Sequence, residues 1–304
     1  MLVVDAFLPQ PGSAIFQSPE FYRLHASGVT AFFFQWAKKG RGIGSLHCTD
    51  SGDGDYLSPR RGTFGGLFID GAMEPKDVKN MVGGVLDHLR AADAKSFTVA
   101  LAPEWHDPVA FALQFYSLTS AGFTVSRCDL DFGRHVGGHP FLETVSADVR
   151  RRNQNIEAIE VVVASPGTPL FSNAYEFIAA NHLAKGYPVS MTLDQLGLME
   201  MTFNGRVRAY GAIYQGALVA AAVCIQIRDD MQHIFLMNSI SHDAAFNAVA
   251  VVVQAIYEDC QRAAIQKLSY GTSTVGSVVN DGLVKFKRSL GFRESIKLSL
   301  ALQF

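Results

Sequence analysis

The chain has 304 residues, of which 48% are hydrophobic and 18% are charged, and its formal net charge is −2. This length and composition predict a compact protein of two domains, or one large domain, with an ample apolar core. Because the net charge is slightly negative, no overall positive field favours nucleic acid, and such a partner is not expected.

The N-terminus, the apolar runs and the cysteines indicate a cellular compartment. The chain does not open with a basic segment followed by a long apolar one, so no signal peptide is expected. The longest apolar runs, near residues 217–227 and 244–256, are too short or too interrupted to span a bilayer. The cysteines lie far apart in apolar patterns: Cys48, Cys128, Cys224 and Cys260. We therefore expect a cytoplasmic protein with buried free thiols.

The first half alternates strand and helix patterns after an irregular start that runs to about residue 28. The expected strands cover residues 2–7, 29–37, 43–49, 63–70, 96–102 and 123–132. The expected helices cover residues 75–92 and 108–121. A hairpin and a third strand, followed by helix, strand, helix and strand, predict an α+β layer with a mixed sheet.

Four polar residues of the first half are candidates for binding a substrate. Arg60 and Arg61 lie beside flexible glycines in the loop at residues 58–66, where they could grip a phosphate or a carboxylate. A solvated turn explains these arginines equally well. Glu104 and His106 follow the fifth expected strand and could face a groove between two domains. His106 is a candidate base, and a loop histidine with no chemical role is the alternative.

Residues 133–155 are expected to bridge two domains, because glycines and a proline break the regular patterns there. We place the boundary within this bridge, so that the domains are residues 1–140 and 141–304. The arginines at positions 150–152 are expected to form a solvated helix face, with contact to an anionic substrate as the alternative.

The second half follows the plan of the first with more helix. The expected strands cover residues 159–164, 206–214, 217–228, 231–241, 267–270 and 294–302. The expected helices cover residues 169–183, 192–203, 244–264 and 279–290. Tight turns at residues 215–216 and 229–230 predict a three-stranded antiparallel meander, and Thr192 is expected to cap its helix.

The stretch YGTSTVGSVVNDGLVKFKRSLGF, at residues 270–292, carries the main functional pattern. The end of an apolar strand runs into a loop of small residues, and an amphipathic helix follows that stops at Gly291. A loop with free backbone N–H groups ahead of a helix is a common way to hold an anionic or carbonyl group. The helix also presents Lys287 near that loop. A simple strand–helix crossover is the alternative.

The segments NDGL at 280–283, FK at 286–287 and GF at 291–292 together resemble a signature of Fem-like members of the GNAT acyltransferase superfamily. These tandem-GNAT proteins include peptidoglycan aminoacyltransferases and acetyltransferase-like proteins. The RRN at 151–153 is similar to the start of the helix that opens their second domain, and the second half has the element order of the GNAT fold. The resemblance implies an α+β protein of two tandem GNAT-like domains, each a mixed sheet flanked by helices, with a first domain that can be degenerate.

The resemblance also implies roles for single residues. Lys287 matches a lysine that lies at the acyl donor and stabilises developing charge, with a surface lysine as the alternative. Tyr270 could protonate a leaving thiolate, or it could be a core tyrosine with a satisfied hydroxyl. The candidates for donor binding could equally cap loops: Asn238, Ser239, Thr272, Ser273, Asn280 and Phe286.

The chain departs from the superfamily where conventional coenzyme A enzymes hold the pyrophosphate. Those enzymes carry a Gln/Arg-x-x-Gly-x-Gly/Ala loop, whereas residues 239–245 read SISHDAA, without glycine. Asp243 would repel phosphate and is better explained as a helix N-cap. Residues 68–74 of the first half also lack the spacing. The strand at 231–241 should still splay from its neighbour and leave backbone groups for a pantetheine arm, but the usual mode of coenzyme A binding is in doubt.

The sequence thus predicts an N-acyltransferase in which an amine attacks the acyl donor directly, with the chemistry on the second domain. The acceptor, by family analogy a saccharide or cell-envelope precursor, is expected between the domains. The donor would be acyl-CoA or another thioester acting as co-substrate, an acyl carrier protein, or aminoacyl-tRNA, which the acidic chain disfavours. No permanently bound cofactor and no metal are expected. The alternative is a non-catalytic binding module that has lost its donor site.

Overall fold

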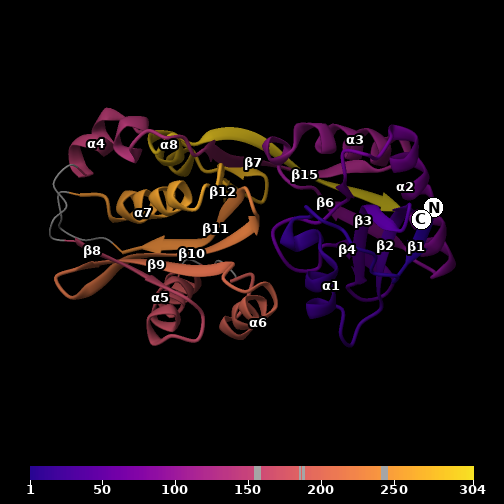
Figure 1. The fold of residues 1–304 in the computed structure, drawn as a ribbon, viewed down its shortest axis with the longest axis horizontal. Helices are drawn as coiled ribbons and strands as arrows, with labels where there is room; N and C mark the ends of the chain where they lie inside the picture. Colours follow the sequence, from indigo (N-terminus) through magenta and orange to yellow (C-terminus); the bar gives the residue numbers. More distant parts are fainter. Residues whose placement is uncertain (154–158, 185, 187–188, 241–245) are drawn as a thin grey trace. The chain divides into compact units, whose positions relative to one another are not determined.

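The computed structural model describes residues 1–153, 159–184, 186, 189–240 and 246–304. The chain forms two compact units, and Figure 1 follows it through both. The first unit is residues 1–130 with 295–304, and the second is residues 131–294. The last strand therefore belongs to the first unit, although the sequence placed it in the second domain. The second unit begins at residue 131, whereas the sequence placed the boundary after residue 140.

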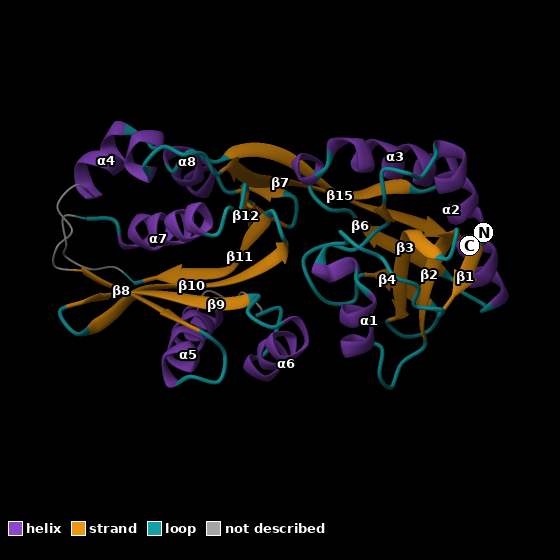
Figure 2. Cartoon of the chain, viewed as in Figure 1, coloured by secondary structure: helices purple, strands orange, loops and turns teal. Residues whose placement is uncertain are grey.

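The first unit is built on a mixed sheet with helices packed against it, as Figure 2 shows. Across the sheet the strands run in the order β1, β2, β3, β4, β6, β15 and β7, and β5 pairs with β3. Their bounds are β1 (Leu2–Val4), β2 (Ala31–Lys38), β3 (Arg41–Asp50), β4 (Asp55–Ser58), β5 (Phe68–Ile69), β6 (Ser96–Ala100), β15 (Arg293–Gln303) and β7 (Thr124–His135). β4 runs parallel to β6, whereas β15 runs antiparallel to it.

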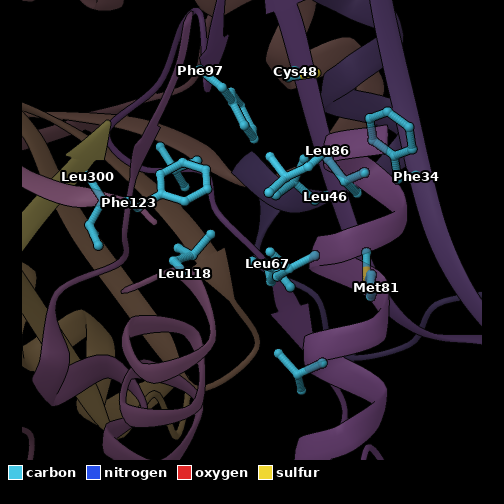
Figure 3. Packing of buried hydrophobic residues seen from close by; sticks show 14 of the residues in the cluster. Phe34, Leu46, Cys48, Leu67, Met81, Leu86, Phe97, Leu118, Phe123 and Leu300 are labelled. Atoms are coloured by element: carbon cyan, nitrogen blue, oxygen red, sulfur yellow. The ribbon is translucent and has the colours of Figure 1, made fainter. Parts of the chain in front are cut away.

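Three helices accompany this sheet. They are α1 (Pro19–His25), α2 (Pro75–Ala91) and α3 (Pro108–Ser120). The α2 helix buries the stripe that its spacing predicts: Val78, Met81, Val82, Val85, Leu86 and Leu89. Figure 3 shows side chains of α2, α3 and the strands gathered in this core, to which β15 contributes Leu298 and Leu300. Each large apolar side chain buried here contributes about 1.5–3 kcal/mol, which holds the C-terminal strand in the first unit.

Three features of the first unit differ from the expectation. The start of the chain, expected to be irregular, contains α1, where Ser18 caps the helix by accepting a hydrogen bond from the Phe21 N–H. The loop before residue 63 contains β4. The expected strand at 63–70 is reduced to the two residues of β5, because glycines in the preceding segment pack it closely against other chain segments instead of pairing it in the sheet.

The strands of the second unit also pair in mixed directions. Its strands run in the order β7, β12, β11, β10, β9 and β8. The remaining bounds are β8 (Ile159–Ala164), β9 (Val207–Tyr214), β10 (Ala217–Arg228), β11 (Met231–Ser239) and β12 (Lys267–Thr272). The strands from β8 to β11 are antiparallel, as the tight turns predict, and β12 runs parallel to β11. β13 (Thr274–Val275) and β14 (Val278–Val279) form a small separate hairpin where the sequence suggested an irregular loop.

The helices of the second unit follow the predicted order. They are α4 (Ala147–Asn153), α5 (Pro169–Ala184), α6 (Leu193–Phe203), α7 (Ala248–Arg262) and α8 (Asp281–Ser289). The α7 helix begins later than expected, because the Asn247 side chain caps it by accepting a hydrogen bond from the Ala250 N–H. The expected cap Asp243 lies outside the described residues.

Thr192 forms a reciprocal cap at the start of α6. Its Oγ1 accepts a hydrogen bond from the Gln195 N–H at 3.2 Å, and its own N–H donates to Gln195 Oε1 at 2.9 Å. Thr192→Ala should lower the free energy of unfolding by about 1 kcal/mol, measured by urea denaturation. Thr202→Ala is the control, because its hydroxyl bonds the Leu198 carbonyl within the same helix and its loss should change stability by less than about 0.5 kcal/mol. Equal losses in the two variants would contradict the capping role.

The cysteines are free, and three of them are buried as expected. Cys128 is exposed, so the expectation was wrong for it; the first part of β7 exposes successive side chains on both faces. Within the described ranges, none of the helices is long and apolar enough to cross a bilayer.

Candidate functional site

The helix α8 carries Lys287 into the interior of the second unit. The Lys287 side chain is only 2% exposed. Its Nζ donates hydrogen bonds to the carbonyl oxygens of Tyr270, Gly271 and Thr272, at 2.8, 2.8 and 2.9 Å. All three hydrogens of the ammonium are thus engaged by one short segment of backbone, and the lysine ties α8 to the end of β12.

The local sequence explains why three carbonyls converge on one atom. The register between β12 and β7 shifts between Ser269 and Gly271, so Tyr270 is an extra residue on β12. Gly271 has a φ of +64°, a left-handed conformation that a residue with a side chain adopts at a cost. A bulge followed by this glycine turns the strand and directs successive carbonyl groups toward the helix.

The surroundings of Lys287 are acidic and aromatic. Asp131 is buried at 2% exposure and pairs with Thr272 in the β7–β12 ladder. The ammonium lies 5.1 Å from the Phe132 ring centroid and 4.8 Å from that of Tyr270. Burial lowers the pKa of Lys287 to about 7, and the Asp131 carboxylate opposes this shift by favouring the charged form.

This lowered pKa predicts how stability depends on pH. Between pH 7 and 9 the unfolded chain keeps the Lys287 proton while the folded protein releases it, so the unfolding free energy should rise with pH. The slope that Lys287 adds is at most about 1.4 kcal/mol per pH unit. Urea denaturation of the wild type and Lys287→Met at several pH values isolates this contribution. A difference between the two proteins that is constant or falls with rising pH would contradict the prediction.

The strands β11 and β12 pair over a short length. Their parallel ladder has three residue pairs and ends at His233 and Ser269, although β11 continues to Ser239 beside β10. The register with β10 also shifts near Phe235, which is an extra residue on β11. After His233, the described residues of β12 no longer pair with β11. The backbone groups on that edge of β11 are therefore left for another partner.

Tyr270 lies at this divergence. Its hydroxyl contacts Met237 Sδ at 2.6 Å, and its ring lies 5.1 Å from that of Phe292. The side chain thus connects β12 to β11 beyond the point where their backbones stop pairing. Burial raises the pKa of Tyr270, so the hydroxyl stays protonated at neutral pH.

The other candidates for donor binding lie at the end of β11, just after β12 and at the start of α8. Asn238 and Ser239 close β11, and Asn238 Oδ1 accepts a hydrogen bond from the Ser239 N–H at 2.8 Å. Ser273 follows β12 and is 1% exposed, and its Oγ has no hydrogen-bond partner among the described residues. Asn280 caps α8 by accepting from the Leu283 N–H at 3.0 Å, which is the loop-capping role left open by the sequence.

Thr272 and Phe286, the two remaining candidates for donor binding, make hydrogen bonds through their backbone carbonyls. The Thr272 carbonyl accepts one of the Lys287 hydrogen bonds, and its side chain is half-buried. Phe286 is half-buried on α8, and its carbonyl accepts a hydrogen bond from the Ser289 hydroxyl at 2.7 Å. Lys287, Tyr270, Thr272, Ser273 and Asn280 are therefore brought together by β12 and α8.

In the first unit, β4 and β6 form a parallel pair like β11 and β12, but the chain segment that follows β4 fills the space beside the end of that pair. β4 pairs with β6 up to Ser58, and the Gly65 N–H then donates to the Ala100 carbonyl at 2.8 Å. The Gly66 N–H donates to Ser58 Oγ at 3.2 Å. A Cβ on Gly65 would lie 2.5 Å from the Pro59 nitrogen, so only glycine fits at this point of the segment. The glycines of the 58–66 loop therefore serve close packing.

The substrate-binding candidates all lie in this first unit. Arg60 and Arg61 are exposed on the same loop. Burial lowers the pKa of His25 to about 4, and both arginines add to that shift, Arg61 more than Arg60. Glu104 Oε2 accepts a hydrogen bond from Ser295 Oγ at 3.0 Å. His106 is 4% exposed, with its ring 5.4 Å from that of Phe64.

Asp131 is the residue of this site that sequence reasoning missed. It lies two residues after Asp129 on the same strand, in CDLDFGRH, and aspartates are seldom buried in the middle of a sheet. That pattern is a signal that a buried cation lies nearby, although nothing in the sequence says which one. Among the residues that the structure describes, no three His, Cys, Asp or Glu side chains gather in a way that could hold a metal.

The sequence itself matches no family model and no curated protein. Solved structures do match. A crystal structure of FemX aligns with a TM-score of 0.72 at 8% identity, covering 97% of this chain and 93% of that one. A tandem GNAT protein from the clavulanic acid biosynthesis pathway aligns with a TM-score of 0.56 at 12% identity, covering 93% and 86%. L-PGS from Bacillus licheniformis aligns with a TM-score of 0.57 at 14% identity, covering 97% and 94%. In its fold, this chain is similar to FemX and to the tandem GNAT protein, as the sequence resemblance predicted.

Proposed function

We propose that the protein is an N-acyltransferase whose donor, an acyl-CoA or a similar thioester, binds between β11 and β12 of the second unit. The observation that carries this proposal is the early end of the β11–β12 ladder at His233 and Ser269. An acyl-pantetheine arm is an extended chain with amides, so it can pair with a strand in the manner of β-strand addition. The fold similarity to a tandem GNAT protein, whose structure was solved without AcCoA, supports a thioester donor.

The chemistry needs two direct contributions from the chain, which are stabilisation of the carbonyl oxygen and a proton for the leaving thiolate. The neutral acceptor amine attacks the acyl carbonyl, so a C–N bond forms and the C–S bond breaks. The amine proton passes to solvent water, and the leaving thiolate gains a proton. Backbone N–H groups freed near the Phe235 bulge are suited to hold the carbonyl oxygen as it becomes negative. Tyr270, protonated at neutral pH, is the proposed proton donor to the leaving thiolate.

Lys287 is proposed as a positioning residue. All its hydrogens are taken by backbone carbonyls, and its side chain is buried, so it acts on the donor through the end of β12. By holding three carbonyls on the helix side, it fixes the orientation of the peptide units beside the proposed donor site.

The first unit is proposed to serve the acceptor. Its own chain fills the space beside β4 with hydrogen bonds from Gly65 and Gly66, which leaves no comparable strand edge for a donor there. Arg60 and Arg61 are exposed and carry the positive charge suited to a phosphate or carboxylate of the acceptor. A saccharide or cell-envelope precursor with a free amine is the proposed class.

Tyr270→Phe tests the proton transfer. The variant keeps the ring that packs on Phe292 and removes the hydroxyl, so kcat should fall at least about tenfold while KM for the donor changes little. Tyr175→Phe is the control, because its hydroxyl bonds the Met191 carbonyl elsewhere in the second unit and its loss should leave kcat unchanged. Equal kcat in wild type and Tyr270→Phe would remove Tyr270 from the mechanism.

The function itself is tested by a donor panel. Acetyl-CoA, a long-chain acyl-CoA and an aminoacyl-tRNA are each added to the full chain, and native mass spectrometry and thermal unfolding report binding. Product formation is then followed with an amino sugar and its nucleotide derivative. Saturable binding of a thioester supports the proposal. Binding of aminoacyl-tRNA alone would replace the thioester by an ester donor, and binding of none would favour a non-catalytic module.

A further inference from the structure

A small polar cavity lies in the second unit where β9 and β11 begin and α7 ends. Its volume is about 50 Å³, whereas a cavity needs only ~10–15 Å³ to hold one water molecule. Arg206, which directly precedes β9, and Arg208 of β9 line the cavity, together with Gln232 of β11 and Asp259 of α7. The acyl-transfer proposal uses none of these residues.

Arg206, which lines this cavity, has an unused donor. Its Nη2 pairs with the exposed Asp229 carboxylate at 2.5 Å. Its Nη1 is buried and has no hydrogen-bond partner among the described residues. A buried charged N–H without an acceptor is costly, so the arrangement favours an acceptor inside the cavity.

The single acid of the cavity wall is already satisfied. Asp259 Oδ2 accepts a hydrogen bond from the Tyr210 hydroxyl at 2.7 Å, and its Oδ1 pairs with Arg262. Tyr210 is therefore occupied as a donor, and the Asp259 charge is compensated by Arg262. Arg206 and Arg208 leave the cavity with a net positive wall.

We infer that this cavity binds a small oxyanion, namely a carboxylate or phosphate group, through the Nη1 edge of Arg206 with Arg208 at the mouth. A planar guanidinium is the side chain best suited to such groups, because it donates two parallel hydrogen bonds to two oxygens. The neutral donors of Gln226 and Gln232 are suited to fix the orientation of the bound group. The inference stands independently of the proposed acyl transfer.

The test titrates the full chain with sodium acetate and with sodium phosphate at constant ionic strength and pH, using isothermal calorimetry and the thermal midpoint. Saturable binding of either anion is expected, with acetate alone identifying a carboxylate site and phosphate alone a phosphate site. Arg206→Gln should weaken this binding at least tenfold. Arg152→Gln removes the same charge from α4, where it pairs with Asp148, and should leave binding unchanged.

A second variant guards against a folding defect. Arg208→Gln alters an exposed side chain, so it should fold like the wild type and weaken the same binding by a smaller factor. Changes in the thermal midpoint that never saturate, or equal binding by the wild type and both cavity variants, would overturn the inference.

Discussion

Replacing Lys287 with methionine should lower the free energy of unfolding by about 3 kcal/mol and reduce the proposed acyl transfer by the remaining folded protein at least about a hundredfold. Methionine fills much of the same space but donates no hydrogen bonds. Three carbonyls at the end of β12 then lose their shared donor, and the buried Asp131 loses its nearby cation. Relief of the buried ammonium offsets part of this cost, which limits the net loss.

The comparison variant is Lys285→Met, because Lys285 is exposed on the same helix. It should change stability by less than about 0.5 kcal/mol and leave kcat unchanged. Lys287→Arg keeps the charge with a different donor geometry, so it should recover part of the stability and part of kcat. If Lys287→Met were as stable and as active as Lys285→Met, the role of Lys287 as the tie between α8 and β12 would be wrong.

Gly291→Ala should destabilise the second unit by about 3 kcal/mol or more, measured by urea denaturation. The glycine follows α8 with a φ of +80°, and its N–H donates to the Arg288 carbonyl while the Phe292 N–H donates to that of Lys287. This is the Schellman arrangement that ends helices. A Cβ at Gly291 would lie 2.7 Å from the carbonyl oxygen of Thr144, a backbone atom that cannot move aside as a side chain can.

Gly216→Ala is the control that measures conformational strain alone, so the difference between the two variants gives the steric part of the cost. Gly216 has a φ of +77° in the turn between β9 and β10, and a Cβ there meets nothing within 4 Å. Its replacement should cost about 1 kcal/mol, from conformational strain alone. Similar losses in the two variants would show that the close approach of Thr144 to Gly291 does not constrain the end of α8.

Local signals predicted most of the elements. The α2 helix was predicted within one residue at its C-terminal end, because its apolar stripe is regular and Pro75 marks its start. Thr192 was predicted to cap α6, and the structure adds Gln195 as its reciprocal partner. The α1 helix carries comparable start signals at Ser18 and Pro19, and it was missed because the surrounding segment lacks periodicity.

Non-local pairing explains what the sequence could not predict. β15 joins β6 of the first unit through five residue pairs from Ser299↔Ala100 to Gln303↔Ser96, and no pattern within β15 identifies that partner. The segment at 63–70 reads as a strand, but Gly65 and Gly66 pack it closely against other parts of the chain. Sequence spacing carries neither kind of information.

The candidate site was predicted in part. The C-terminal signature predicted that Lys287 and the loop before its helix form part of the site. In the structure, Lys287 donates hydrogen bonds to the carbonyls of Tyr270, Gly271 and Thr272. The sequence could not show that backbone carbonyls take all three of its hydrogens, because this depends on the bulge at Tyr270. It also could not pair the lysine with Asp131, which precedes it by more than a hundred residues and lies on another strand.

Hydrogen–deuterium exchange of the full chain, with and without the thioester that the donor panel selects, tests whether the donor binds between β11 and β12. We expect the donor to slow exchange in residues 234–240 at the end of β11 and 270–273 at the end of β12, and to leave exchange in residues 58–67 of the first unit unchanged. Slower exchange confined to residues 58–67, with no change in the second unit, would contradict it.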